Sequence, residues 1–282
     1  MRRILAVVAL LVVLSATPAL AITDGELDGD GHPMVGIMVA MGWHEDEEGN
    51  EVYGPMWRCS GTLLSPTVYL TAGHCVEEPA EEARVWFGAD MRDEDATGYP
   101  TSGGVTGSLH VHPEYYNAPW WLHDLGIVVL DRPVRLRQYA RLPGLDLIDR
   151  IVYKKYPSKS GGKRKLGFTA VGYGLQKAFT NPKLWYKEEA NRVRMVSYPK
   201  LVQINVPGYT GPNTLVLSNN ANTGGTCFGD SGGPNFIRHN RLGKYVVGAV
   251  TSFGTNGNCA GLGGVQRVDR QHALDFIQPF LN

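Results

Sequence analysis

Short runs of apolar and β-branched residues, separated by glycine-rich or polar turns, recur along most of the chain and predict β-strands. These runs cover residues 36–41, 57–64, 68–72, 84–88, 191–196, 215–217 and 245–253. One stretch has a different period, because residues 269–281 place Ala273, Phe276, Ile277, Phe280 and Leu281 on one helical face. Asp269 precedes this stretch and is the expected N-cap. The pattern predicts an all-β protein with a C-terminal helix.

The first 21 residues have the three parts of a secretory signal peptide. Arg2 and Arg3 supply positive charge, residues 4–14 form an apolar core, and residues 19–21 read Ala-Leu-Ala, a small-x-small cleavage site. A core of about eleven residues is too short to span a bilayer, which takes about twenty. The segment predicts a secreted, extracellular protein that starts at Ile22 and is not attached to a membrane after cleavage.

Composition narrows the class of protein. The chain has 282 residues, enough for one large domain or two small ones. Its 27 basic and 27 acidic residues give a formal net charge of zero, so a nucleic-acid or anionic-membrane partner is not expected. Four cysteines in an exported chain predict two disulfides, and spacing alone leaves three pairings open.

Three short blocks carry the candidate chemistry. Ser231 lies in Thr-Cys-Phe-Gly-Asp-Ser-Gly-Gly-Pro, His74 in Thr-Ala-Gly-His-Cys, and Asp124 at the head of an apolar run. A serine hydroxyl becomes a nucleophile when a base takes its proton and N–H groups stabilise the resulting oxyanion. Singly, each block is explained as well by a surface turn or a core histidine. Together they predict nucleophilic serine catalysis.

In their order, His, Asp, Ser, the blocks resemble the motifs of the chymotrypsin-like serine proteases, the trypsin superfamily. The resemblance covers residues 22–282 and implies two six-stranded antiparallel Greek-key barrels, a C-terminal α-helix and an active site in the cleft between the barrels. It places the N-terminal barrel at about 22–142, a linker at about 143–164 and the C-terminal barrel with its helix at about 165–282.

The resemblance also implies residue roles. Ser231 would attack the scissile carbonyl, His74 would accept its proton, and Asp124 would orient the imidazole. The backbone N–H groups of Gly229 and Ser231 would form the oxyanion hole. The four cysteines would pair as Cys59–Cys75 and Cys227–Cys259.

A further implication concerns the new N-terminus. Residues 22–25 read Ile-Thr-Asp-Gly and resemble the family's activated N-terminus, usually Ile-Val-Gly-Gly. In the family this α-amino group pairs with the acid before the nucleophile, which is Asp230 here. No segment separates Ala21 from Ile22, so signal peptidase itself is expected to produce the active N-terminus, without a zymogen stage.

Specificity is predicted from the residues that match the family's substrate pocket. These are Gly225, Thr226, Ser252, Phe253, Gly254 and Gly264. Gly225 stands where trypsin-like members carry an acid, and an unpaired cationic side chain in a desolvated slot is costly. Gly254 and Gly264 are expected to leave the pocket walls open. We therefore expect Phe, Tyr, Leu or Met at P1, the residue before the cleaved bond.

No metal and no cofactor are expected. His110 and His112, two residues apart, could ligate a metal on one face of a strand. However, residues 112–115 resemble the family's segment ahead of the catalytic acid, which favours a structural role. The carboxylate-rich run 44–48 is interpreted as a solvated loop.

The sequence thus predicts a secreted serine endopeptidase, a monomer whose partners are a peptide or protein substrate and a proteinaceous inhibitor. One alternative is a protease-like binding protein without turnover, but such relatives usually lack a triad member. A second is an esterase using the same triad. The strand edge at 252–254, expected to pair with extended substrate backbone, favours peptides.

Overall fold

The computed structural model of the chain describes residues 22–117, 119–153, 166–176, 191–206 and 211–282. The expected signal peptide (1–21) and the basic part of the expected linker (154–165) lie outside the described residues. The strands are β1 (Glu26–Leu27), β2 (Val35–Glu45), β3 (Glu51–Leu63), β4 (Val68–Thr71), β5 (Glu82–Trp86), β6 (Val105–Val111), β7 (Gly126–Leu130), β8 (Gly167–Gly172), β9 (Met195–Ser197), β10 (Leu201–Val206), β11 (Gly211–Asn219), β12 (Pro234–Arg238), β13 (Val247–Gly254) and β14 (Gly261–Arg267). The helices are α1 (Glu94–Thr97), α2 (Leu147–Tyr153) and α3 (Gln271–Ile277), with 3₁₀ turns η1 (Gly73–Cys75), η2 (Trp120–Leu122) and η3 (Gln278–Leu281).

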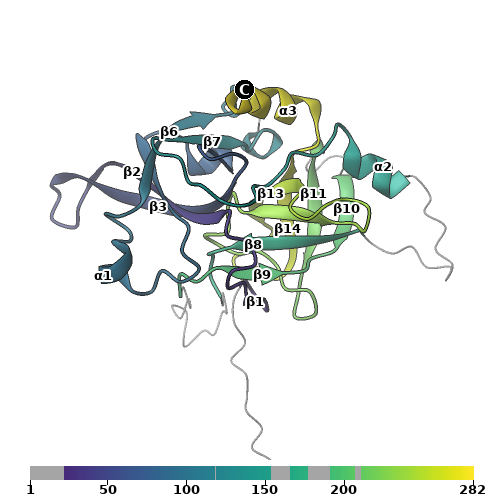
Figure 1. Cartoon of the computed structure of the whole chain (residues 1–282), viewed down its shortest axis with the longest axis horizontal. Coiled ribbons are helices and arrows are strands. Elements are labelled where there is room, and N and C mark those ends of the chain that lie inside the picture. The colour runs from purple at the N-terminus through teal and green to yellow at the C-terminus, as the bar shows by residue number, and fades with distance from the viewer. Residues whose placement is uncertain (1–21, 118, 154–165, 177–190, 207–210) are drawn as a thin grey trace, which may run out of the picture.

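The first half of the chain closes into a six-stranded antiparallel barrel in the order β2-β3-β4-β7-β6-β5. Figure 1 shows this barrel in purple to blue beside the green strands of the second half. Eight consecutive residues of β2, 35–42, are buried, because this strand pairs with β3 on one side and β5 on the other.

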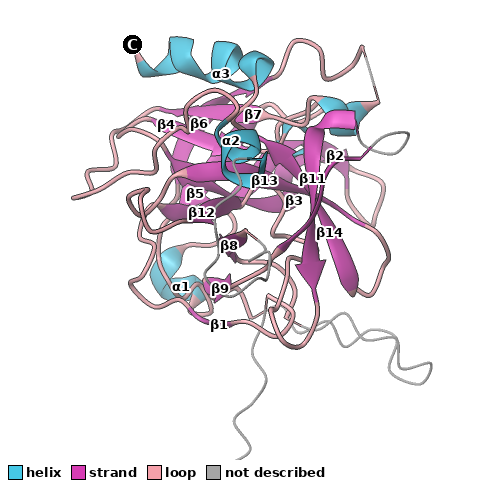
Figure 2. Cartoon of the chain, turned by 90° about the vertical axis from the view of Figure 1, so that its right-hand side faces the viewer, coloured by secondary structure: helices cyan, strands magenta, loops and turns pink. Residues whose placement is uncertain are grey.

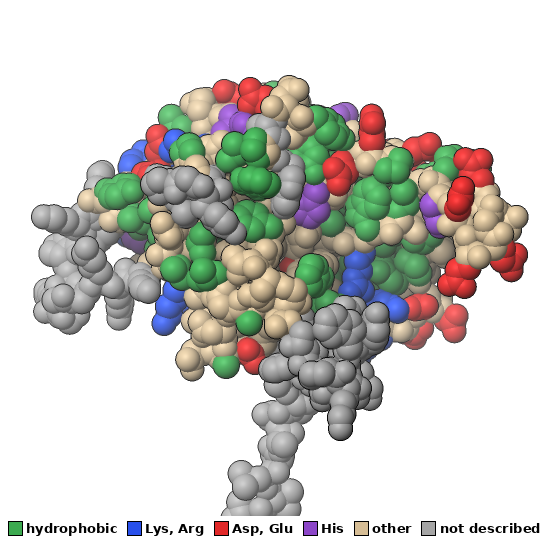
Figure 3. Space-filling model, turned by 180° about the vertical axis from the view of Figure 1, so that it is seen from behind, with side chains coloured by type: hydrophobic (Ala, Val, Ile, Leu, Met, Phe, Trp, Pro, Cys, Tyr) green, Lys and Arg blue, Asp and Glu red, His purple; other side chains and the backbone are tan. Residues whose placement is uncertain are grey.

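The β2–β3 hairpin is longer than the apolar pattern predicts. The sequence indicates strands over 36–41 and 57–64, whereas pairing continues outward to Glu45↔Glu51. Trp43 and Tyr53 pack edge to face there, with ring centroids 5.5 Å apart. Figure 3 shows acidic side chains gathered over this projecting hairpin, at the right of the view. The outer part of this hairpin is exposed, so its sequence lacks the apolar pattern of a buried strand. Backbone pairing and one aromatic contact nevertheless hold it in the sheet.

The second sheet has eight strands, in the order β1-β9-β8-β12-β13-β14-β11-β10, where the resemblance implies six. One added strand, β1, comes from the start of the described chain and pairs with β9. The buried Asp28 carboxylate next to β1 accepts from Nε of Arg194 at 2.8 Å, beside β9. This ion pair joins residues that were expected to belong to the N-terminal barrel to the second half.

The terminal helix is confirmed, but its predicted cap is wrong. Arg270 occupies the N-cap position of α3, and no side chain caps this end. Asp269 is fully buried and instead accepts from Arg267 (2.8 Å) and from the N–H of Ile148 in α2 (2.8 Å). The buried guanidinium of Arg267 holds this carboxylate, and the helix terminus that it caps is the first turn of α2 rather than that of α3. Figure 2 shows α3 lying over the barrel at β6 and β7.

The predicted fold class is confirmed: a mostly β chain with two sheets and a short C-terminal helix. Part of the expected linker is ordered as α2, whose buried Ile148 belongs to the core of the second sheet. Among the described residues, no helix is long and apolar enough to cross a membrane.

Candidate active site

Strand pairing brings the histidine and aspartate blocks together. β4 leads into η1, which carries His74, and Asp124 lies two residues before β7. β4 and β7 pair antiparallel, with Thr71 opposite Gly126, so the two blocks meet at the same end of the barrel. The fully buried Asp124 carboxylate accepts from the backbone N–H of His74 (2.9 Å) and lies 2.9 Å from Nδ1 of its ring. This contact fixes the imidazole ring of His74, with Nδ1 toward Asp124 and Nε2 on the side of the ring away from that carboxylate.

Opposing effects act on the pKa of His74. Burial disfavours the charged ring, but the carboxylates of Asp124 and Glu77 together more than offset this, so the pKa of His74 is raised above its ordinary value of 6.5. The Ser252 hydroxyl in β13 donates to Asp124 Oδ2 at 2.5 Å. We expected Ser252 only as a pocket residue, and the sequence gives no signal for this second contact. The two halves of the molecule therefore meet at the Asp124 carboxylate.

The loop that carries Ser231 is held on both sides. The Ser231 carbonyl accepts from the N–H of Ser60 in β3 (2.8 Å), and the N–H of Gly232 donates to Thr251 in β13 (2.7 Å). The buried Ser60 hydroxyl also donates to the carbonyl of Gly229 (2.9 Å). Sequence reasoning missed Ser60, and only its place next to Cys59 hinted at it. β3 of the barrel thereby supports the loop of the second half.

The N–H groups of Gly229 and Ser231 donate to no protein acceptor within the described part of the chain. Gly229 has φ +91°, and a Cβ there would come within 3.2 Å of the Cα of Gly174 and 3.1 Å of Nε of Arg58. Only glycine takes this conformation without strain in that space. Both N–H groups are therefore free to bind a developing oxyanion.

Asp230, between these two residues, is fully buried. Its carboxylate accepts from the N–H groups of Gly174 (2.8 Å) and Cys227 (2.9 Å). Burial raises the pKa of Asp230 to about 7, even though these hydrogen bonds and nearby Arg58 favour the charged form. The burial of this carboxylate is thus incompletely compensated by its present partners.

Ile22, the expected partner, is also fully buried and packs with Val193 and Met195. Its nitrogen is here an amide bonded to Ala21 and carries no charge. The next residue, Thr23, donates from its hydroxyl to Asn219 Oδ1 (2.7 Å). The start of the described chain is thus docked on the second half.

Both disulfides pair as the resemblance implies. Cys59–Cys75 joins β3 to the 3₁₀ turn that carries His74, with Cα atoms 6.0 Å apart. Cys227–Cys259 joins the nucleophile loop to the segment after β13, with Cα atoms 5.2 Å apart. Because Cys59 and Cys75 are bonded to each other, they offer no thiolate beside His74 for a metal.

Of the expected pocket residues, Phe253 and Gly254 lie on β13 and Gly264 on the paired strand β14, and the space around Gly264 is less open than the sequence suggests. Phe253 lies directly opposite Gly264, and a Cβ on Gly264 would come within 2.2–2.5 Å of three ring atoms of Phe253. The ring therefore covers Gly264. The Asn219 side chain similarly fills the space at Gly225, within 2.1 Å of a Cβ built there, and donates to the carbonyl of Thr226 (2.8 Å).

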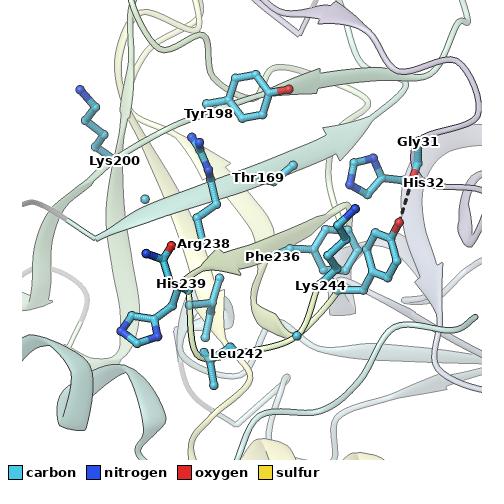
Figure 4. Close-up of a pocket in the computed structure, with 15 residues that line it drawn as sticks. Gly31, His32, Thr169, Tyr198, Lys200, Phe236, Arg238, His239, Leu242 and Lys244 are labelled. Atoms are coloured by element: carbon cyan, nitrogen blue, oxygen red, sulfur yellow. Dashed lines mark hydrogen bonds between the residues drawn. The ribbon is translucent and has the colours of Figure 1, made fainter.

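A separate hollow lies beside β8 and β12, and Lys200, Arg238 and Tyr245 are among the residues that line it. Figure 4 shows this region. The Arg238 guanidinium stacks on Tyr198, 4.8 Å from the ring centroid, and the Tyr245 hydroxyl donates to Gly31 (3.1 Å). None of His74, Asp124 and Ser231 lines this hollow, so it is not the expected substrate site.

Comparison with known proteins agrees with this arrangement. A family model described as Trypsin matches residues 38–277. Chymotrypsin-like elastase family member 1 of Macaca fascicularis is 29% identical over 203 residues, 71% of this chain and 70% of that protein. Brachyurin of Leptuca pugilator is 28% identical over 72% of this chain and 79% of its own length. A solved structure, HL collagenase, superposes with a TM-score of 0.61 at 20% identity over 91% of this chain and 97% of that chain.

Proposed function

The chain belongs to the trypsin family of serine endopeptidases, and we propose that it hydrolyses peptide bonds through Ser231, His74 and Asp124. The observation that carries the proposal is the buried Asp124 carboxylate, which holds both the backbone N–H and the ring of His74. That contact leaves Nε2 as the nitrogen able to accept a proton. Peptides or proteins are the substrates that this family implies.

Each step uses groups of this chain. His74 takes the Ser231 proton while Oγ attacks the scissile carbonyl, and Asp124 stabilises the imidazolium. The oxyanion accepts from the N–H groups of Gly229 and Ser231. His74 then gives its proton to the leaving amine, and water repeats the sequence on the acyl-enzyme. The raised pKa of His74 helps it hold the proton between these steps.

The N-terminus completes the oxyanion loop in this proposal. Cleavage after Ala21 would convert the Ile22 amide into an ammonium group, and Asp230 is the buried carboxylate suited to receive it. The resulting ion pair would fix the loop between Gly229 and Ser231. The enzyme would then be secreted and active without a zymogen stage, as a monomer open to a proteinaceous inhibitor.

We further propose a neutral, large apolar P1 residue. The absence of a carboxylate at Gly225 supports this, and the Phe253 ring over Gly264 adds an apolar surface. The ring also occupies space that a long side chain needs, so a large P1 residue must displace it. Phe253→Ala is therefore expected to raise kcat/KM for Phe and Tyr at P1 relative to Ala and Val.

A peptide-library digest by the purified mature protein, read by mass spectrometry, tests the function. Cleavage after apolar residues that disappears in Ser231→Ala supports both the triad and the neutral pocket. Cleavage after Arg or Lys keeps the triad and refutes the pocket. No cleavage by folded protein that begins at Ile22 supports a binding protein instead, and ester turnover without peptide turnover supports an esterase.

A further inference from the structure

Three histidines meet at the terminal helix, two from neighbouring segments of the barrel and one from the helix itself. His112 follows β6 directly, His123 lies between η2 and β7, and His272 is in α3. One nitrogen of each ring lies within 4.8 Å of the other two. Figure 2 shows how this happens, because α3 lies over the barrel at β6 and β7. His112 is only 4% exposed, and the other two are half-buried.

The distances within the cluster suit a tetrahedral metal. Nδ1 of His272 lies 3.3 Å from Nδ1 of His123 and 3.4 Å from Nε2 of His112. Two nitrogens bound to a tetrahedral Zn²⁺ at about 2.0–2.1 Å lie about 3.3–3.4 Å from each other. We propose that His112, His123 and His272 form a binding site for a divalent transition-metal ion such as Zn²⁺, with water in the fourth position.

His272 faces the other two histidines through Nδ1. Its Nε2 is buried and has no hydrogen-bond partner among the described residues. The polar atoms near its Nδ1 are the nitrogens of the other two rings. Burial lowers the pKa of all three imidazoles, that of His272 to about 3, so the rings are neutral and able to offer lone pairs.

Glu114 provides a supporting contact. Its carboxylate lies 3.3 Å from Nε2 of His123. A carboxylate on the far nitrogen of a ligating histidine keeps the proton there and turns the other nitrogen toward the metal. The Glu114 side chain thus favours His123 Nδ1 as a ligand.

The backbone of Glu114 makes the contact that a metal must break. Its N–H donates to Nδ1 of His112 (3.1 Å), so neutral His112 carries its proton on Nε2, between its ring and His272. A metal on Nε2 replaces that proton, which moves to Nδ1, and the Glu114 N–H loses its acceptor. No proton is gained or lost overall. Metal uptake should therefore shift the amide resonance of Glu114.

The proposed ion would join the end of β6, the start of β7 and α3, and so anchor the terminal helix on the barrel. The test is calorimetric titration of the chelator-treated mature protein with Zn²⁺, starting from His74→Ala so that the proposed catalytic imidazole cannot bind the ion. We expect one Zn²⁺ per chain, a rise in Tm on binding, and an intense tetrahedral d–d absorption band with Co²⁺.

Ligand variants decide the outcome. His272→Ala and His123→Asn should each weaken Zn²⁺ binding by more than about 100-fold, and Glu114→Gln by about 10–100-fold. His110→Ala is the matched control, because His110 lies in β6 two residues away and packs on Phe280 (centroids 4.9 Å apart). His123→Asn, outside the helix, serves if His272→Ala fails to fold. Unchanged affinity in either ligand variant, or an octahedral Co²⁺ spectrum, overturns the proposal.

Discussion

Two buried carboxylates of the proposed active site, Asp124 and Asp230, differ in the groups that stabilise their negative charge. Both are fully buried. Asp124 contacts the backbone and ring of His74 and the hydroxyl of Ser252, so its partners come from both halves of the fold. Asp230 accepts from two backbone N–H groups, and burial raises its pKa to about 7.

The difference shows which part of the site the fold completes by itself. Asp124 already has a titratable partner in His74, and strand pairing alone brings the two together. The two backbone N–H groups that donate to Asp230 stabilise its negative charge incompletely while Ile22 is an amide. The triad side of the site is thus built by folding, whereas in the proposed function the oxyanion side awaits a charge that cleavage after Ala21 would supply.

The largest expected effect tests the Asp124 side. Asp124→Asn should lower kcat on a peptide substrate by about 10⁴-fold, because the amide favours the wrong tautomer of His74 while keeping the geometry. Steady-state kinetics measure this, with the Tm showing that the variant remains folded. A loss below tenfold would mean that Asp124 does not orient the base.

The second effect tests the Asp230 side. One extra alanine ahead of Ile22 blocks the proposed ammonium group and should lower kcat/KM by about 10²–10³-fold, the effect of losing one oxyanion donor. Asp230→Asn in the mature chain should give a loss of similar size. Combining the two changes should cost little more, because both remove the same ion pair. Full activity of the extended chain would refute the proposed pairing.

A third prediction separates the two carboxylates by pH. In the extended chain, Asp230 keeps a proton up to about pH 7, whereas its ordinary pKa is 3.8. The folded state then binds more protons than the unfolded state between these values, so its free energy of unfolding should fall as pH rises from about 4 to about 7. Denaturant melts at several pH values measure this. Asp230→Asn in the same extended chain should remove that component, and an unchanged slope would contradict the raised pKa.

The smallest effect concerns the contact between the two halves. Ser252→Ala removes one hydrogen bond to the buried Asp124 carboxylate, which should cost about 1.5–3 kcal/mol of stability and lower kcat about tenfold or less. Thermal melts and kinetics on one preparation check both. Ser252→Thr, which keeps the hydroxyl, is the control. If it behaves like Ser252→Ala, packing rather than the hydrogen bond matters.

Local signals in the sequence predicted much of this protein. Short apolar and β-branched runs predicted seven of the fourteen described strands. The helical face of residues 273–281 predicted α3, because burial of one face leaves a periodic trace. The blocks around His74, Asp124 and Ser231 were ambiguous singly, and only the three together, in their order, predicted serine catalysis. The resemblance to the family, applied to the cysteine positions, predicted the Cys59–Cys75 and Cys227–Cys259 disulfides that the structure contains.

Other features depend on contacts between residues far apart in the chain, and no local pattern reports them. Asp269 was expected to cap α3, but buried Arg267 recruits it. Gly264 was expected to leave a pocket wall open, but Phe253 on the neighbouring strand covers it. The projecting hairpin and the pairing of β1 with β9 depend on backbone hydrogen bonds, which any sequence can make.

The sequence by itself determined the family, the fold class and the candidate catalytic residues. Only the tertiary structure decided which partners surround each charge: Ser252 on Asp124, two backbone N–H groups on Asp230, and His112, His123 and His272 in one cluster. The reason is physical. Electrostatic and hydrogen-bond energies depend on distance and burial in space, whereas the sequence records only order along the chain.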